Sequence, residues 1–283
     1  MLSYRHAFHA GSFADILKHL VLANTLDHVI RKPAPVLYID THAGAACYSL
    51  HSAMARKTRE ADKGILALTF AALARQLDPE ARAGLDSYQK ALLPFLGRHH
   101  YPGSPALAAA LLRPQDRLHL YELHNTDFNH LNDYFAQEHR TVCEKADGFL
   151  SARALLPPVH KRAVVLLDPS YEIKDDYKKV VAYLSTASQR MRDIHLLLWY
   201  PVVQRQDCDK MIARIMRAGL RDLWQFELGM TPDTSDFGMS ASGIIAVNPP
   251  WTLPGRLRQI LPALQQQLAP LQGNWKVECL VPE

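Results

Sequence analysis

The chain lacks several features that mark secreted, membrane or disulfide-bonded proteins. Its four cysteines are far apart and form no CxxC pair, which favours a reducing compartment (Cys47, Cys143, Cys208, Cys279). No run of about 18 uncharged apolar residues is present, so the sequence predicts no transmembrane helix. Residues 1–6 include none of the apolar stretch of a signal peptide. We therefore expect a cytoplasmic protein with no membrane partner.

Two common catalytic signatures are also missing. No GxSxG turn is present, which argues against a serine hydrolase of the elbow type. The 14 histidines show neither HExxH nor any comparable ligand spacing, so we expect no metal site. The net charge of +4 is well short of the strongly basic balance of a protein that binds nucleic acid by charge alone. It permits a nucleic-acid partner without requiring one.

The pattern of apolar residues predicts an α/β fold. Residues 12–32 have the periodicity of an amphipathic helix, and two prolines (Pro33, Pro35) end it before a short strand, Val36–Ile39. Further strand-like runs follow, most of them separated by helical segments such as 175–192 and 205–218. These runs are Leu118–Tyr121, Thr141–Cys143, Ala163–Leu167, His195–Tyr200, Leu223–Leu228 and Gly243–Val247. Such alternation predicts a mainly parallel sheet with helices on both faces.

Residues 51–98 differ in character from the rest of the chain. Charged residues crowd its first part, an Ala/Leu-rich helical pattern follows, and no strand is evident. We predict that 51–98 is an inserted helical subdomain, and that 1–50 and 99–283 form the core.

Candidate binding residues stand at the ends of successive strands, the edge where open α/β sheets bind their ligands. The first strand runs into a loop with one glycine, Asp40-Thr41-His42-Ala43-Gly44, which is either a nucleoside-binding loop or an ordinary turn. Glu122 follows the next strand outside the insertion and is either a ribose-binding carboxylate or a solvated charge. Asp147-Gly148 follows the third, where an adenine contact and a plain turn are both possible. Their order along the chain favours binding of a nucleoside cofactor. His42 is either a cofactor contact or a local turn residue.

The most informative stretch is Asp168-Pro169-Ser170-Tyr171, which follows the strand Ala163–Leu167. The lone pair of an adenine amino group is delocalised into the ring, so the group is a poor nucleophile. Asp168 and the carbonyl of Pro169 can accept its two N–H groups, and Tyr171 can stack on a base flipped from its helix. A rival motif, Asn248-Pro249-Pro250-Trp251, has the same chemical parts. It follows the last strand-like run, so we interpret it as a strand terminator with a packing tryptophan on the far side of the sheet.

A series of short motifs runs along nearly the whole chain. They are Tyr4-Arg5-His6-Ala7-Phe8-His9-Ala10-Gly11, Ala14–His19, Tyr38–Gly44, Tyr101–Pro105, Lys145–Phe149, Asp168–Glu172, Leu198–Val203, Ser240–Gly243 and Asn248–Trp251. Together they resemble the motifs of the RlmJ family, bacterial enzymes that methylate N6 of adenine 2030 in 23S ribosomal RNA.

The resemblance implies a Rossmann-like methyltransferase fold, S-adenosylmethionine as methyl donor and ribosomal RNA as partner. It places donor binding on His19, His42, Ser104, Glu122, Asp147, Gly148 and Asp168, with Asp168 also as the catalytic acceptor. It implies a substrate contact at Tyr4, and we expect Arg5 and His6 to help order the RNA-facing N-terminus. Two departures stand out. Ser170 replaces the second proline of the family's Asp-Pro-Pro-Tyr, with some loss of stiffness, and Ala46-Cys47 stands where family members carry Gly-Arg.

The sequence thus predicts a methyltransferase that acts on an adenine of ribosomal RNA through Asp168, Pro169 and Tyr171. Two alternatives stay open. Asp-Pro-x-Tyr does not distinguish RNA from DNA, so the substrate can be DNA adenine. A chain of the same fold can also bind RNA or nucleotides without catalysis. We expect a monomer.

Overall fold

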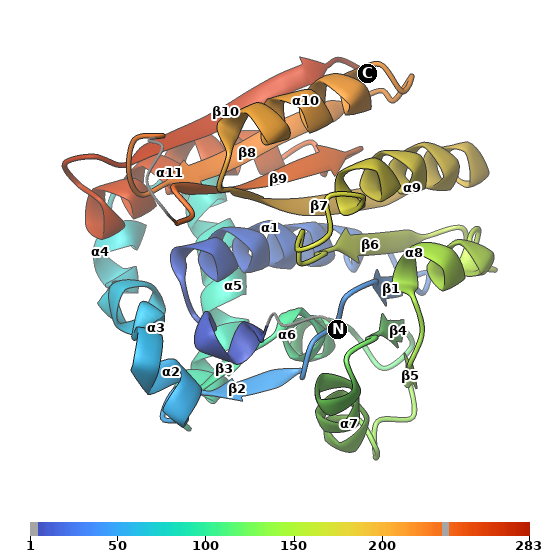
Figure 1. The fold of residues 1–283 in the computed structure, drawn as a ribbon, viewed down its shortest axis with the longest axis horizontal. Helices are drawn as coiled ribbons and strands as arrows, with labels where there is room; N and C mark the ends of the chain where they lie inside the picture. Colours follow the sequence, from blue (N-terminus) through green and yellow to red (C-terminus); the bar gives the residue numbers. More distant parts are fainter. Residues whose placement is uncertain (1–4, 234–237) are drawn as a thin grey trace.

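A mainly parallel sheet of eight strands lies at the centre of the protein in the computed structural model, which describes residues 5–233 and 238–283 (Figure 1). Its order is β10-β8-β9-β7-β6-β1-β4-β5, and β9 and β10 run against the other six. The strands are β1 (Leu37–Asp40), β4 (Arg117–Tyr121), β5 (Thr141–Glu144), β6 (Ala163–Leu167), β7 (His195–Val202), β8 (Leu223–Gly229), β9 (Ala241–Val247) and β10 (Asn274–Val281). The predicted α/β class is confirmed.

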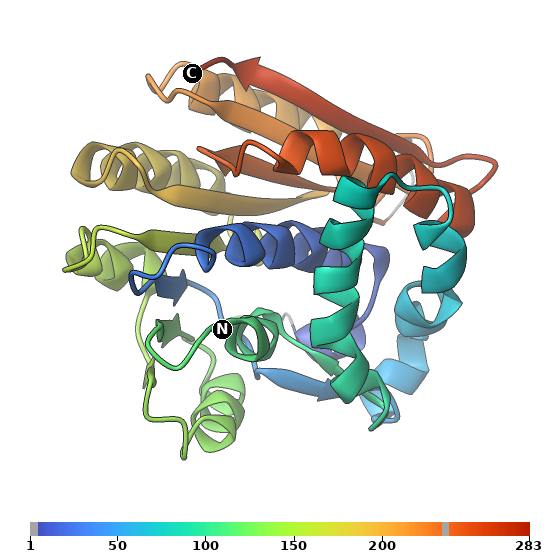
Figure 2. The same ribbon diagram turned by 180° about the vertical axis from the view of Figure 1, so that it is seen from behind.

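Helices cover both faces of this sheet (Figures 1 and 2). One face carries α1 (Phe13–Val29), α5 (Pro79–Leu96), α6 (Ser104–Leu111) and α11 (Leu253–Leu268), and the other carries α9 (Asp176–Arg190) and α10 (Arg205–Met216). Strand β6 shows why both faces need cover. Val164 and Leu166 join the core on the α1 side, whereas Val165 and Leu167 join the core on the α9 side. A strand buried on both faces is a continuous apolar run rather than an alternating one.

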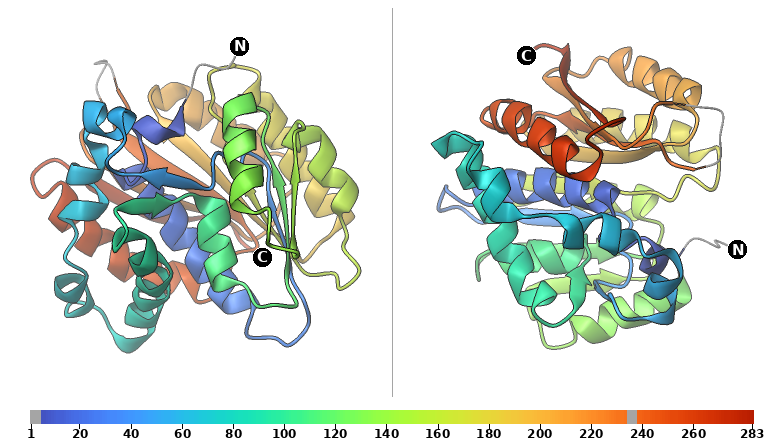
Figure 3. Two further views of the ribbon diagram at one scale, coloured as in Figure 1. Left: turned by 90° about the horizontal axis from the view of Figure 1, so that it is seen from below. Right: turned by 90° about the vertical axis from the view of Figure 1, so that its left-hand side faces the viewer.

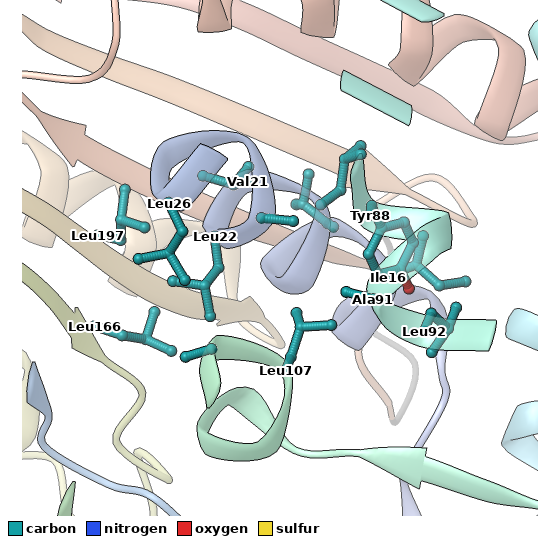
Figure 4. Close-up of a cluster of buried hydrophobic side chains, with 14 of the residues drawn as sticks. Ile16, Val21, Leu22, Leu26, Tyr88, Ala91, Leu92, Leu107, Leu166 and Leu197 are labelled. Atoms are coloured by element: carbon teal, nitrogen blue, oxygen red, sulfur yellow. The ribbon is translucent and has the colours of Figure 1, made fainter. Parts of the chain in front are cut away.

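Helix α1 is buried on nearly every side, which corrects the expectation of an amphipathic helix. Its Leu22 and Leu26 lie towards Leu166 and Leu197 of the sheet, and its Ile16 lies towards α5 (Figure 4). Helices α5, α6 and α11 all contact it. A helix enclosed in this way has no solvent face on which to segregate polar residues. The buried polar residues of α1 therefore need hydrogen-bond or ion-pair partners inside the protein.

The segment 51–98 contains only helices and turns, and the hairpin formed by β2 (Cys47–Ser49) and β3 (His100–Pro102) flanks it. Its shorter helices are α2 (Ala53–Thr58), α3 (Glu60–Lys63), η2 (Ile65–Ala67) and α4 (Phe70–Ala74). The remaining short elements of the protein are η1 (His6–Phe8), α7 (Asn125–Tyr134), α8 (Gly148–Ser151) and η3 (Ala152–Leu155). Within the described ranges, no helix is long and apolar enough to cross a membrane.

The motif Asn248–Trp251 lies at the edge of the sheet opposite the Asp168 loop, as predicted from its place in the chain. Strand β9 is antiparallel to β7, so its last residue, Val247, pairs with Leu196 near the start of β7. Leu198, by contrast, pairs with Leu167, which immediately precedes Asp168. The packing role expected of Trp251 is wrong, because 84% of this side chain is exposed.

Candidate active site

A cavity opens at the carboxyl ends of β1, β4, β5 and β6, where the parallel strands bring four loops together. The loops contribute Thr41–Gly44, Glu122–His124, Ala146–Phe149 and Asp168–Ser170. The N-terminal part of the chain adds His6 and Lys18, the hairpin and α6 add Tyr48 and Ser104, and β7 adds Trp199. Most of the residues predicted for the site therefore lie in one cavity, although about 160 residues separate His6 from Pro169.

The loop after β1 and the end of β4 are joined by Glu122. Its Oε2 accepts a hydrogen bond from the backbone N–H of Gly44 (2.8 Å), and its Oε1 accepts one from that of His124 (2.6 Å). A carboxylate has about four acceptor positions, so the two oxygens still have capacity for two hydroxyl groups. Burial raises the pKa of Glu122 despite these two bonds. Glu122 is thus a fixed acceptor in the cavity wall and not a solvated charge.

The loop after β5 approaches the loop after β1 very closely. A Cβ atom on Gly148 would lie 2.2 Å from the carbonyl oxygen of Thr41, so only glycine fits there. Asp147 caps α8 by accepting from the N–H of Phe149 (2.9 Å). The ring of His42 meets that of Phe149 edge-on at 4.7 Å, and burial lowers the pKa of His42 to about 3. His42 therefore lines the cavity as an uncharged imidazole ring.

Ser104 lines the cavity through a hydroxyl that a buried carboxylate holds. Its Oγ donates to Asp40 Oδ2 (2.6 Å), which also accepts from the hydroxyl of Tyr38 (2.8 Å). Asp40 is fully buried, and this burial, with the nearby charge of Asp168, raises its pKa to about 6 against the lowering effect of the two hydroxyls. Because the hydroxyl proton of Ser104 is donated to Asp40, the lone pairs of its oxygen are what Ser104 presents to the cavity, as a hydrogen-bond acceptor.

Asp168 is held by Lys18, a buried lysine that was not predicted as a site residue. Lys18 Nζ lies 2.7 Å from Asp168 Oδ2 and 3.0 Å from Asp15 Oδ1, while Asp15 Oδ2 contacts His6 Nε2 at 3.0 Å. Burial alone would lower the pKa of Lys18, but the charges of Asp168 and Asp15 outweigh it and raise that pKa. The available signal was two opposite charges, Asp15 and Lys18, three positions apart in the mainly apolar first half of the helix.

Tyr171 does not line the cavity, so the predicted stacking of this ring on the target base is not what the structure shows. Its hydroxyl donates to the carbonyl oxygen of Trp199 (2.8 Å), and its ring packs against Tyr177. Trp199 itself lies in the cavity wall, donates from Nε1 to Ser242 Oγ (2.8 Å) and has Lys18 Nζ 5.8 Å from its ring centre. An aromatic ring does line the cavity, but it belongs to Trp199 of β7 and not to the tyrosine of the Asp-Pro-x-Tyr motif.

Two other predicted residues do not line the cavity, and a third lies outside the part of the chain that the structure describes. His19 is fully buried and is not among the residues that line the cavity; its Nδ1 lies 3.0 Å from the hydroxyl of Tyr101, and its contact with the methyl donor stays a prediction. Arg5 stands at the rim, where it pairs with Asp127 at 3.6 Å. Tyr4 lies outside the described residues. Over 5–233 and 238–283, no group of three or more His, Cys, Asp or Glu is placed to hold a metal ion.

The residues present fit a nucleoside sulfonium cofactor. A ribose has two hydroxyls for Glu122, a purine has an amino group for Asp147, and an α-amino acid has a donor group for Ser104. The glycines at 44 and 148 keep the loops close enough to enclose such a molecule. The fold and this cavity define a Rossmann-like methyltransferase that uses S-adenosylmethionine.

Comparison with known proteins identifies the family. Residues 33–281 match the family described as "Ribosomal RNA large subunit methyltransferase D, RlmJ", and the chain belongs to this family. It is 43% identical to the ribosomal RNA large subunit methyltransferase J of Escherichia coli and 40% identical to that of Haemophilus influenzae, over 100% of each chain. A crystal structure of a Legionella pneumophila protein superimposes with a TM-score of 0.83 at 30% identity, covering 96% of this chain and 98% of the other.

Proposed function

We propose that this protein transfers the methyl group of S-adenosylmethionine to N6 of an adenine in large-subunit ribosomal RNA. The observation that carries the proposal is the presence of Asp168 and Pro169 in the same cavity as Glu122, Asp147 and Gly44. A donor site and an amine-holding site that share one cavity can bring a methyl group and a nitrogen together. The named activities of the two full-length relatives support ribosomal RNA as the substrate.

Asp168 and Pro169 hold the target amine in this mechanism. Lys18 engages Oδ2 of Asp168, so Oδ1 is the oxygen left to accept one N–H of the amine, and the carbonyl of Pro169 accepts the other. These two bonds direct the nitrogen lone pair out of the ring plane towards the donor. When bound, S-adenosylmethionine supplies an electrophilic methyl group. Much of the rate then comes from orientation, because the two reactants are held in line.

Lys18 shapes the role of Asp168 further. Lys18 occupies one oxygen of Asp168, and an aspartate is a weak base towards an adenine amino group, so Asp168 orients the amine and does not remove its proton before attack. The nitrogen bonds the methyl carbon as the carbon–sulfur bond of the donor breaks, and the cationic nitrogen then gives its proton through the hydrogen bond to Asp168 Oδ1 and on to solvent. We propose that Trp199 stacks on the flipped adenine, because it is the aromatic side chain beside Asp168 in the cavity wall.

Transfer of labelled methyl to protein-free large-subunit ribosomal RNA tests the proposal, with Asp168→Ala and Asp168→Asn as variants. Wild type should label the RNA, Asp168→Ala should lose transfer, and Asp168→Asn should lose less because an amide oxygen still accepts. Equal labelling by Asp168→Ala and wild type would show that the amine is held elsewhere. Wild type that binds S-adenosylhomocysteine but labels neither RNA nor DNA would favour a non-catalytic binding protein.

Ser170→Pro addresses the departure from the family motif. Ser170 lines the cavity beside Asp168, and proline would fix its φ angle. We expect a modest rise in kcat with an unchanged KM for RNA.

We further propose that 51–98 is an inserted helical subdomain and that the protein acts as a cytoplasmic monomer. The target being adenine 2030 is part of the same proposal, and mapping the labelled nucleotide tests it.

A further inference from the structure

The cavity itself is poorly suited to attract RNA, because carboxylates dominate its wall. Glu122, Asp127, Asp147, Asp168 and Asp176 all line it. Its two lysines are already paired, Lys18 with Asp168 and Lys179 with Asp176. A phosphate backbone is repelled by such a surface, whereas its affinity for a protein comes largely from Lys and Arg. The cations that hold the RNA must therefore lie outside the cavity.

Two parts of the chain contain basic residues and no acidic ones. Residues 41–59 have no Asp or Glu, and neither do residues 87–115. Their exposed cations include Arg56 and Arg98, and Lys63 follows shortly after the first stretch. None of these three side chains has an acidic partner among the residues that the structure describes. We call Arg56, Lys63 and Arg98, with the exposed His51 and His99, the basic rim.

The fold brings the two halves of the basic rim together. The N–H of Leu50 donates to the carbonyl oxygen of His99 (2.9 Å), and the rings of His51 and His99 stack at 4.5 Å. This contact joins the turn after β2 to the turn before β3. Arg56 and Lys63 lie on α2 and α3, which follow directly from that turn.

The basic rim also lies beside the mouth of the cavity. Tyr48 on β2 lines the cavity and packs against His6 of η1 at 5.0 Å between ring centres. Helix α2 contacts η1, because Thr58 donates to the carbonyl oxygen of Phe8 and Lys57 Nζ lies 5.9 Å from the Phe8 ring centre. Figure 3 shows α2 and α3 beside η1.

The other sides of the mouth do not offer the same charge. Helix α7 carries Asp127 and Asp133 and no lysine or arginine. At the start of α9, Lys178 pairs with Asp175 and Lys179 with Asp176, each at 3.6 Å. Cations next to carboxylates attract phosphate less than cations without them. Exposed Lys145 and Lys174 each stand singly beside the loops that follow β5 and β6, whereas the basic rim groups three cations. The approach of a polyanion is thus favoured from the side of the basic rim.

We propose that the basic rim binds the phosphate backbone of the RNA strand next to the flipped adenine. This inference rests on the proposed function and assigns substrate recognition to the helical segment 51–98 and the turn before β3. RNA lying on the basic rim enters the cavity past η1 and Tyr48. The rim contributes affinity and direction, and the cavity contributes the choice of base.

The test compares two triple variants that remove the same charge. Arg56→Gln, Lys63→Gln and Arg98→Gln neutralise the rim. Arg214→Gln, Arg217→Gln and Arg221→Gln neutralise three exposed arginines on and after α10, on the far part of the sheet. Binding of protein-free large-subunit ribosomal RNA is measured from about 0.15 M to 1 M salt, and binding of S-adenosylhomocysteine is measured by calorimetry.

We expect the rim variant to bind RNA roughly 50-fold more weakly at 0.15 M salt, since three single-strand phosphate contacts each contribute about 0.7 to the salt slope. The difference should nearly vanish at 1 M salt, and affinity for S-adenosylhomocysteine should stay within about twofold of wild type in both variants. Equal RNA affinity of the two triple variants would overturn the proposal. Arg98→Gln alone, at an exposed turn, should produce about one third of the change in slope, which guards against misfolding of the triple variant.

Failure of the proposed function has a different signature. If wild type binds S-adenosylhomocysteine and RNA but transfers no methyl group, the catalytic assignment fails while the rim can still be scored by its salt slope. If methyl transfer is normal and the rim variant keeps the wild-type salt slope, only the rim is refuted.

Discussion

Asp40→Asn should change how the stability of the protein depends on pH. Asp40 is fully buried, and its pKa is raised from the ordinary 3.8 to about 6. Each pKa unit corresponds to about 1.4 kcal/mol, so this rise corresponds to about 3 kcal/mol. Because the folded pKa is above the unfolded one, the contribution of Asp40 to stability is fully present below about pH 4. It is lost as the pH rises through about 6.

Urea unfolding of wild type and Asp40→Asn between about pH 4.5 and 7.5 measures this effect. An asparagine cannot ionise, so the unfolding free energy of the variant lacks the contribution of this group. About a third of the 3 kcal/mol is already lost at pH 4.5, so the difference between wild type and variant should shift by about 2 kcal/mol in favour of the variant across this range. A difference that stays constant across this range would refute the buried ionisation of Asp40.

Ser104→Ala links the same group to the cavity. Ser104 donates to Asp40, and this bond lowers the pKa of Asp40. Without the hydroxyl, the pH at which the stability difference appears should move upwards. Affinity for S-adenosylhomocysteine should fall more than affinity for its analogue without the α-amino group, because Ser104 presents an acceptor. Tyr38→Phe is the matched control, since it removes the other hydroxyl bonded to Asp40 and leaves Ser104 in place. Equal losses for both ligands in Ser104→Ala would contradict the acceptor role.

Three further predictions follow from single contacts. Lys18→Met leaves Asp15 and Asp168 without their ammonium and should lower the unfolding free energy at pH 7 by about 3 kcal/mol, less at acid pH; unchanged urea unfolding would contradict this. Ala46→Gly should raise the unfolding free energy by up to about 1 kcal/mol, and with it the melting temperature, because Ala46 has a φ of 65°. The control Ala45→Gly should lower it. Trp199→Ala should raise the KM for RNA roughly tenfold, from the loss of one stacked base, with little change in S-adenosylhomocysteine binding.

The order of the strand-end residues was predictable because neighbouring parallel strands end at one edge of a sheet. Glu122 was predicted to follow the first strand after the helical segment, and in the structure it lies beside the loop after β1, where it accepts from the N–H of Gly44. What periodicity could not show was the direction of side chains. Tyr171 was placed by chemical analogy, yet a φ of 56° at this residue turns it towards the carbonyl of Trp199.

The features that were not predicted leave little or no local pattern in the sequence. Strands β2 and β3 are three residues each, too short for an alternating pattern to be seen. Strand β10 lies at the sheet edge and is largely exposed, so its apolar signal is weak. The enclosure of α1 depends on α5 and α11, which are distant in sequence, and no local pattern reports a contact of that range.

The enclosure of α1 ties the chemistry of the site to the order in which the chain is made. Lys18 and Asp15 are synthesised early, but β8, β9 and α11, which cover α1, come from the last quarter of the sequence. Until those elements form, α5, α6, β6 and β7 cover only part of the apolar surface of α1. A nascent or C-terminally truncated chain is therefore expected to lack a working site, even though every predicted site residue precedes β8.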